Sequence, residues 1–64
     1  MSAVKDDAKM VVQELFGPIS ARRLDRMDDS NPIFFLNQVK DMISAMLGPK
    51  AAEQKLAPLY AKYK

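Results

Sequence analysis

Apolar residues recur along this chain at the spacing of amphipathic helices, and glycine, proline and small polar residues separate the periodic segments. Residues 3–16 carry apolar side chains three or four positions apart, which is the pattern of a helix with one buried face. Gly17 is expected to close this helix in a left-handed conformation, and Pro18 fits the first position of a second helix that reaches about Met27. The positions expected to be buried are Val4, Ala8, Val11, Val12 and Leu15, followed by Ile19, Ala21, Leu24 and Met27.

The second half of the chain predicts another pair of helices. Residues 32–47 form the most apolar segment, with Ser30 or Asn31 as its expected N-cap; Ser2 is the corresponding residue of the first helix. A fourth helix begins at Pro49, and Pro58 either kinks it or separates a last turn, because a proline removes a helical hydrogen bond. The apolar stripe of these helices consists of Phe35, Leu36, Val39, Met42, Ile43, Met46 and Leu47, then Ala51, Ala52 and Leu56.

The two halves repeat each other at an offset of 31 residues. Leu-Phe-Gly-Pro at 15–18 returns as Met-Leu-Gly-Pro at 46–49, and the upstream apolar positions keep the same offset. A repeated unit that cannot bury its own apolar face needs its neighbour. We therefore predict an all-α domain over residues 1–64, with four to five helices in two pseudo-repeated hairpins, at about 3–27 and about 32–64.

Composition narrows the classes of function. The 64 residues carry a net charge of +2 and contain neither cysteine nor histidine, so the usual zinc ligands and thiol chemistry are absent from the sequence. No lysine or carboxylate stands at a spacing from serines 20, 30 and 44 that would indicate a base-assisted nucleophile. The two glycines form no phosphate loop. We expect no enzyme, cofactor, metal or small-molecule substrate. The charged N-terminal residues and the lack of an apolar run of about 20 residues predict a cytoplasmic protein without a membrane span.

The acidic pair Asp28-Asp29 has two interpretations. It is a candidate for cation binding, but it lacks the alternating acidic spacing of a calcium loop. Capping of the following helix, with complementation of its dipole, is the favoured interpretation.

The first Gly-Pro segment resembles a known DNA-binding motif. Residues 16–24, Phe-Gly-Pro-Ile-Ser-Ala-Arg-Arg-Leu, fit the second half of a helix-hairpin-helix motif, in which backbone N–H groups at the hairpin contact phosphate. The chain departs from that family at Leu15 and Met46, where a further glycine is expected, and at Lys55, where a leucine is expected. The favoured interpretation is structural: glycine ends one helix, proline starts the next and alanine permits close packing. The resemblance implies, as the alternative, duplex binding through Gly17, Arg22, Arg23, Arg26, Gly48 and Lys50.

A second resemblance covers more of the chain. Segments 14–24 and 35–56, with Phe-Gly-Pro-Ile-Ser-Ala followed by a Leu-Gly helix end and a Lys-Ala helix, are similar to small helical modules appended to archaeal and other prokaryotic regulatory proteins. This resemblance implies a regulatory or interaction role by analogy.

The hypothesis about function depends on Phe34, because this residue points about 100° away from the apolar stripe of its helix. Two explanations stay open: the segment after Pro58 folds back and covers the ring, or the ring anchors a protein partner or a second copy of this chain. The C-terminal Tyr60, Lys62, Tyr63 and Lys64 are also candidates for contact with nucleic acid. The favoured interpretation is that Leu59 and Tyr60 or Tyr63 cover the end of the core while the lysines stay solvated. The leading hypothesis is a non-enzymatic interaction module whose partner surface comprises Phe34, Gln38, Asp41, Tyr60 and Tyr63.

Overall fold

The computed structural model describes residues 3–63, which contain helices and connecting loops but no strand. Helix α1 (Ala3–Phe16) and helix α2 (Pro18–Arg22), which continues as the 3₁₀ helix η1 (Arg23–Arg26), form the first hairpin. Helices α3 (Pro32–Leu47) and α4 (Pro49–Tyr63) form the second. The all-α class and the bounds predicted for the first and third helices are confirmed. The expected cap Ser2 and the terminal Lys64 lie outside the described residues.

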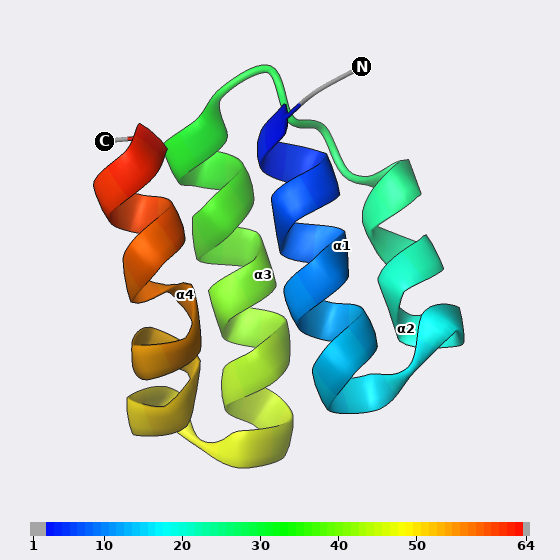
Figure 1. Ribbon diagram of the computed structural model, residues 1–64, viewed down its shortest axis with the longest axis vertical. Coiled ribbons are helices and arrows are strands. Elements are labelled where there is room, and N and C mark those ends of the chain that lie inside the picture. Colours follow the sequence, from blue (N-terminus) through cyan, green and yellow to red (C-terminus); the bar gives the residue numbers. More distant parts are fainter. Residues whose placement is uncertain (1–2, 64) are drawn as a thin grey trace.

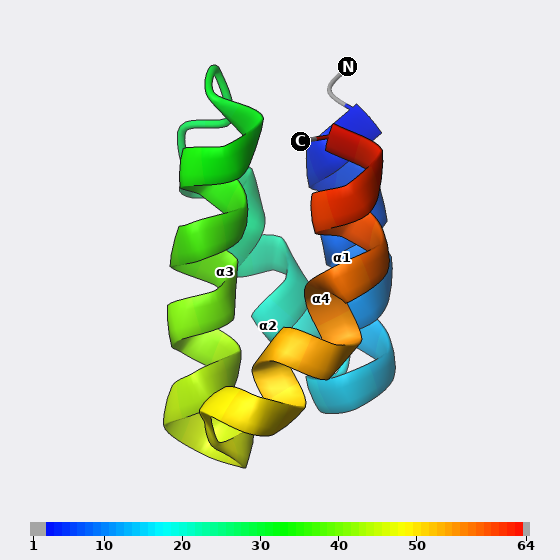
Figure 2. The same ribbon diagram turned by 90° about the vertical axis from the view of Figure 1, so that its left-hand side faces the viewer.

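In the view of Figure 1, the helices follow one another from left to right in the order α4, α3, α1, α2. Seen at a right angle, α3 faces α1 and α4 across the core (Figure 2). The connector 27–31 carries the chain over the upper end of the bundle, from η1 to the start of α3. Both Gly-Pro turns lie at the lower end, so each hairpin closes at the same end of the molecule.

The core lies between α1, α3 and α4 and is closed on one side by α2 and η1. Every helix contributes apolar side chains at helical spacing, and Leu24 of η1 is completely buried with them. Truncating such a buried leucine costs about 2–5 kcal/mol, so the short η1 segment is a structural part of the domain. The buried residues are Val4, Ala8, Val12, Ala21, Leu24, Phe35, Leu36, Val39, Ile43, Ala52 and Leu56.

Three residues that the pattern assigned to the core are exposed. Met46 and Leu47 have the correct phase on α3, but the lower end of this helix extends beyond α1 and α2, so the other hairpin does not reach them (Figures 1 and 2). Ile19 lies about 200° around the helix from the buried Ala21, because each residue turns an α-helix by about 100°. The expectation that all three are buried was wrong.

Both glycines have positive φ, which confirms the predicted role of each as a helix end. Gly17 has φ 94° and ψ 176°, and Gly48 has φ 90° and ψ 156°. These ψ values differ from the expected left-handed helical conformation and place both residues in a region that is essentially restricted to glycine. The N–H of Gly17 donates to the carbonyl oxygen of Gln13 at 2.9 Å, while its own carbonyl accepts from Ala21 at 3.3 Å. One glycine therefore ends α1 and starts α2.

Pro58 lies inside a continuous helix, which decides between the two alternatives for the C-terminal segment. Helix α4 runs through Pro58 to Tyr63, and it bends in the stretch before the proline (Figure 2). A proline lacks the N–H that would bond to the carbonyl four residues earlier, and this loss commonly bends a helix.

The two hairpins share a burial pattern but differ in length. Equivalent pairs at the 31-residue offset, such as Val4 with Phe35 and Ala21 with Ala52, are buried together. After its glycine, the first hairpin has a helix of five residues and a 3₁₀ turn, whereas the second has a helix of 15 residues. The repeat of the two whole hairpins stays a prediction.

Candidate interaction surfaces

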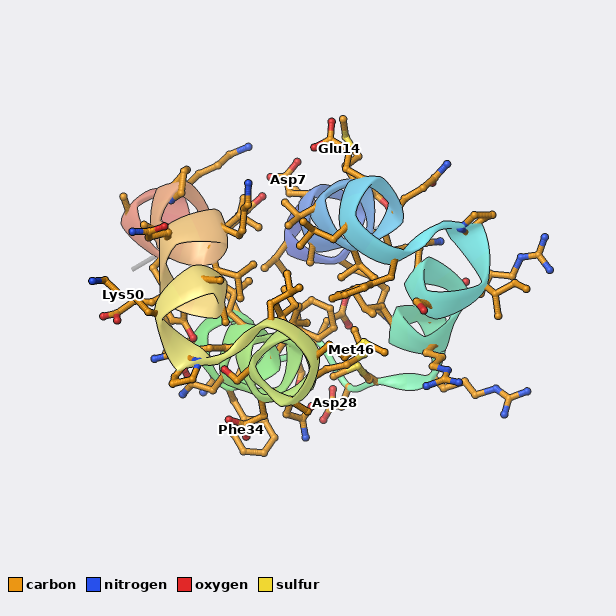
Figure 3. The ribbon with its side chains drawn as sticks, turned by 90° about the horizontal axis from the view of Figure 1, so that it is seen from below. Asp7, Glu14, Asp28, Phe34, Met46 and Lys50 are labelled. Atoms are coloured by element: carbon orange, nitrogen blue, oxygen red, sulfur yellow. The ribbon has the colours of Figure 1, made fainter. Side chains whose placement is uncertain are left out.

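Phe34 projects from the first turn of α3, and the N-cap of that helix holds this turn in place. The side-chain oxygen of Asn31 accepts hydrogen bonds from the backbone N–H groups of Ile33 and Phe34, each at 3.1 Å. The Phe34 side chain points away from the bundle, and the residue is 56% exposed (Figure 3). Gln38 and Asp41 follow it on the same side of α3, one half-buried and one exposed.

A groove lies between α3 and α4, and Ile33, the residue before Phe34, is one of its lining residues. Tyr60 of α4 lines it and donates a hydrogen bond from its hydroxyl to Oδ1 of Asn37, at 2.6 Å. The pKa of Tyr60 is raised, mainly by burial and to a smaller extent by the negative charge of Asp41. The hydroxyl is therefore a donor at neutral pH. The groove has a volume of about 450 Å³ and is lined by Ile33, Asn37, Lys40, Glu53, Ala57 and Tyr60. We call Phe34, Gln38, Asp41 and this groove the Phe34 surface.

Tyr63 belongs to a different contact. Its hydroxyl donates to Oδ2 of Asp7 on α1 at 2.7 Å, and Nζ of Lys62 lies 2.9 Å from the same oxygen. The hydrogen bond from Tyr63, and next that from Lys62, lowers the pKa of the Asp7 carboxyl. The same carboxylate raises the pKa of both partners. These three residues tie the end of α4 to α1, and neither tyrosine covers Phe34.

Three arginines surround an exposed isoleucine on α2 and η1. From Ile19, residues 22, 23 and 26 lie within about 60° on the helical projection, so all four share one face. Ile19 is 72% exposed, and the three arginines are exposed as well. Among residues 3–63, the two ion pairs are Lys9–Asp25 and Lys62–Asp7, so none of these guanidinium groups is neutralised by a contacting carboxylate. We call Ile19, Arg22, Arg23 and Arg26 the arginine patch.

The remaining residues of the proposed duplex-binding set lie apart from the arginine patch. Lys50 is on α4, at the edge of the bundle opposite α2 (Figure 3). The N–H groups of Gly17 and Gly48 bond to the preceding helices, to the carbonyls of Gln13 and Ser44. The structure thus brings the arginines together but separates them from the lysine, and it uses both glycine N–H groups internally.

Asp28 has a local structural partner. Its Oδ1 accepts a hydrogen bond from the N–H of Ser30 at 2.9 Å, and this bond lowers the pKa of the Asp28 carboxyl. Such a side-chain turn is a common way for aspartate to order a connector. Within residues 3–63, no group of three or more acidic side chains is placed to hold a metal ion. In the same range, no helix combines the length and apolar character needed to cross a bilayer.

One exposed face was missed in the sequence. Met10 of α1 is 67% exposed, and two carboxylates flank it one turn before and one turn after, at Asp6 and Glu14. Glu14 points away from the bundle (Figure 3). The signal was present in the pattern, because Met10 lies about 160° from Ala8 and Val12 around the helix and so cannot share their face. We call Asp6, Met10, Gln13 and Glu14 the α1 outer stripe.

Comparisons with known proteins add nothing to the geometry: no protein-family model, no curated protein and no solved structure matches this chain. The resemblances noted from the sequence therefore stay predictions.

Proposed function

We propose that this chain is a small non-enzymatic interaction module that docks a protein partner, or a second copy of itself, through the Phe34 surface. The observation that carries the proposal is the exposed Phe34 ring on a turn that Asn31 caps. An aromatic side chain has few rotatable bonds, so it loses little conformational freedom on binding and can contribute about 2 kcal/mol or more to an interface.

The groove between α3 and α4 supports the same proposal. It offers the mixed chemistry of protein interfaces, with apolar walls from Ile33 and Ala57 and a hydrogen-bonded tyrosine at its edge. Lys40 and Glu53 also line the groove and offer charges of both signs to a partner side chain inserted there. This arrangement favours a protein partner over an entirely anionic one.

Site-specific photo-crosslinking tests the proposal. A benzophenone amino acid replaces Phe34 in one protein and the exposed Gln54 in a matched control, and each is irradiated in an extract of the source cells. We expect one dominant adduct from position 34 that unlabelled wild-type protein competes away and that Phe34→Ala protein does not. Equal adducts from both positions, or equal competition by the two proteins, would contradict the proposal.

The alternative is binding to a nucleic-acid duplex, and the arginine patch is the observation that favours it. Arginine pairs well with phosphate, and such contacts carry no sequence information. Arg22→Ala and Arg23→Ala should then weaken binding equally for all duplex sequences, and Lys50→Ala should weaken it as well. Affinity should fall steeply with salt through counterion release. No measurable binding to duplex DNA or RNA at low salt would remove this alternative.

A further inference from the structure

The α1 outer stripe and the arginine patch are complementary in charge and similar in layout. Each has an exposed apolar side chain, Met10 in one and Ile19 in the other, with charged residues around it. Those charges are two carboxylates in the α1 outer stripe and three guanidinium groups in the arginine patch. None of the five belongs to an ion pair among residues 3–63.

The two surfaces also match in length. Asp6 to Glu14 spans about 12 Å at the α-helical rise of about 1.5 Å per residue. Ile19 to Arg26 spans a similar distance of about 12 Å, because its second half is a 3₁₀ helix with a rise of about 2 Å per residue. Helices α1 and α2 are neighbours in the bundle (Figure 1). The two surfaces lie on the outer sides of these two helices, which we call together the α1–α2 edge.

We propose that this edge is a self-association surface, on which the α1 outer stripe of one molecule packs against the arginine patch of a second copy. A twofold pair forms this contact twice, because in a twofold interface each surface of one copy meets the complementary surface of the other. Met10 and Ile19 are then buried against each other, while Asp6 and Glu14 face the arginines. The proposal is independent of the Phe34 surface, which lies on α3 and α4.

A second copy explains more of this edge than a phosphate polymer does. Phosphate contacts would use the arginines but would leave Ile19 without an apolar partner, and they would give no role to the α1 outer stripe. A charge-complementary contact uses all three features, and burial of the apolar centre adds a contribution that salt does not screen.

Sedimentation equilibrium with charge-swap variants tests the proposal. We expect the wild-type protein to approach twice its chain mass of 7.2 kDa at low salt, over a range from about 10 µM to about 1 mM, and to dissociate as salt shortens the screening length. Two variants, R22E/R26E and D6K/E14K, should each be monomeric alone, because both of their contacts become repulsive. Mixed in equal amounts, they should form a heterodimer, because both contacts are attractive again.

The controls separate this proposal from the others. K50E/K55E makes the same change in charge as R22E/R26E at exposed positions on α4, and it should leave the dissociation constant within about twofold of wild type, since distant sites usually act independently. Phe34→Ala should also leave self-association unchanged.

A wild-type protein that is monomeric throughout this range overturns the proposal, as does a mixture of the two swaps that fails to associate although each variant is folded by circular dichroism. Loss of association in Phe34→Ala would place the contact on the Phe34 surface instead. Salt-sensitive binding of duplex DNA or anionic vesicles by a monomeric protein, lost in R22E/R26E, would assign the arginine patch to a polyanion.

Discussion

Replacing Gly17 by the two mirror forms of alanine tests whether its backbone conformation holds the first hairpin together. At φ 94° and ψ 176°, an L-residue is in a region that costs about 1–3 kcal/mol. Space is not the obstacle, because a Cβ atom built on Gly17 meets no other atom within 4 Å. Any destabilisation by L-alanine therefore reports on the backbone alone.

The expected magnitude follows from two opposing effects. Alanine restricts the unfolded chain, which returns about 0.4–1 kcal/mol of stability against the strain in the folded state. The net loss for Gly17→Ala is then about 1–2 kcal/mol, which lowers the unfolding temperature of a domain of this size by about 5–15 °C. Gly48, at φ 90°, should respond similarly.

D-alanine reverses the prediction. The mirror image of the Gly17 conformation is an ordinary extended backbone, so the D-residue adopts it without strain and still restricts the unfolded chain. Chemical synthesis gives all three proteins, and thermal unfolding followed by circular dichroism compares them. We expect the D-alanine protein to be at least as stable as wild type and the L-alanine protein to be clearly less stable. Equal losses from the two forms would refute the reasoning, because chirality would then be irrelevant at this turn.

Two further predictions concern the ends of α3 and α4. Asn31→Ala removes the acceptor for two backbone N–H groups and should cost about 1 kcal/mol in urea denaturation, whereas Gln54→Ala at an exposed site should stay within about 0.5 kcal/mol of wild type. The second prediction concerns the contact of Asp7 with Tyr63 and Lys62. The Asp7 carboxyl has a folded-state pKa below its ordinary 3.8, so its contribution to stability is complete above that value and is lost as pH falls through the folded pKa. Tyr63 and Lys62 have raised pKa values, so their contributions to stability are lost as pH rises above about 10. The stability difference between wild type and Asp7→Asn should therefore be largest between about pH 5 and pH 9 and should shrink at both extremes; a difference that stays constant from neutral pH to about pH 2 would contradict this assignment.

Helix bounds were predictable because local chemistry sets them. Gly-Pro ends one helix and starts another within two residues, and Asn31 before Pro32 combines an N-cap with a residue suited to the first turn. These signals act over a few residues and need no tertiary context. The 3₁₀ segment η1 was not predicted, since its choice over an α-helical turn depends on bringing Leu24 into a core formed by other helices.

The composition of the Phe34 surface was predictable only in part. Tyr60 and Tyr63 are three residues apart, so their side chains leave α4 about 60° apart. Helix α4 contacts both α3 and α1. Because of the angle between the two side chains, Tyr60 bonds to Asn37 of α3 and Tyr63 bonds to Asp7 of α1. A helical pattern gives the angle between two side chains, but only the neighbouring helices decide which groove each one enters.

The edge formed by α1 and α2 shows how much a periodic pattern can still reveal. The burial of Ile19 together with Ala21 was excluded by angle alone, because residues two apart on a helix point about 200° away from each other. Once Ala21 and Leu24 define the inner side of α2 and η1, the arginines must surround Ile19 on the outer side. The same reasoning places Met10 opposite Ala8 and Val12 on α1. What the pattern could not provide was the position of these two outer faces relative to each other. That position depends on the Gly17 turn, which packs the two helices side by side.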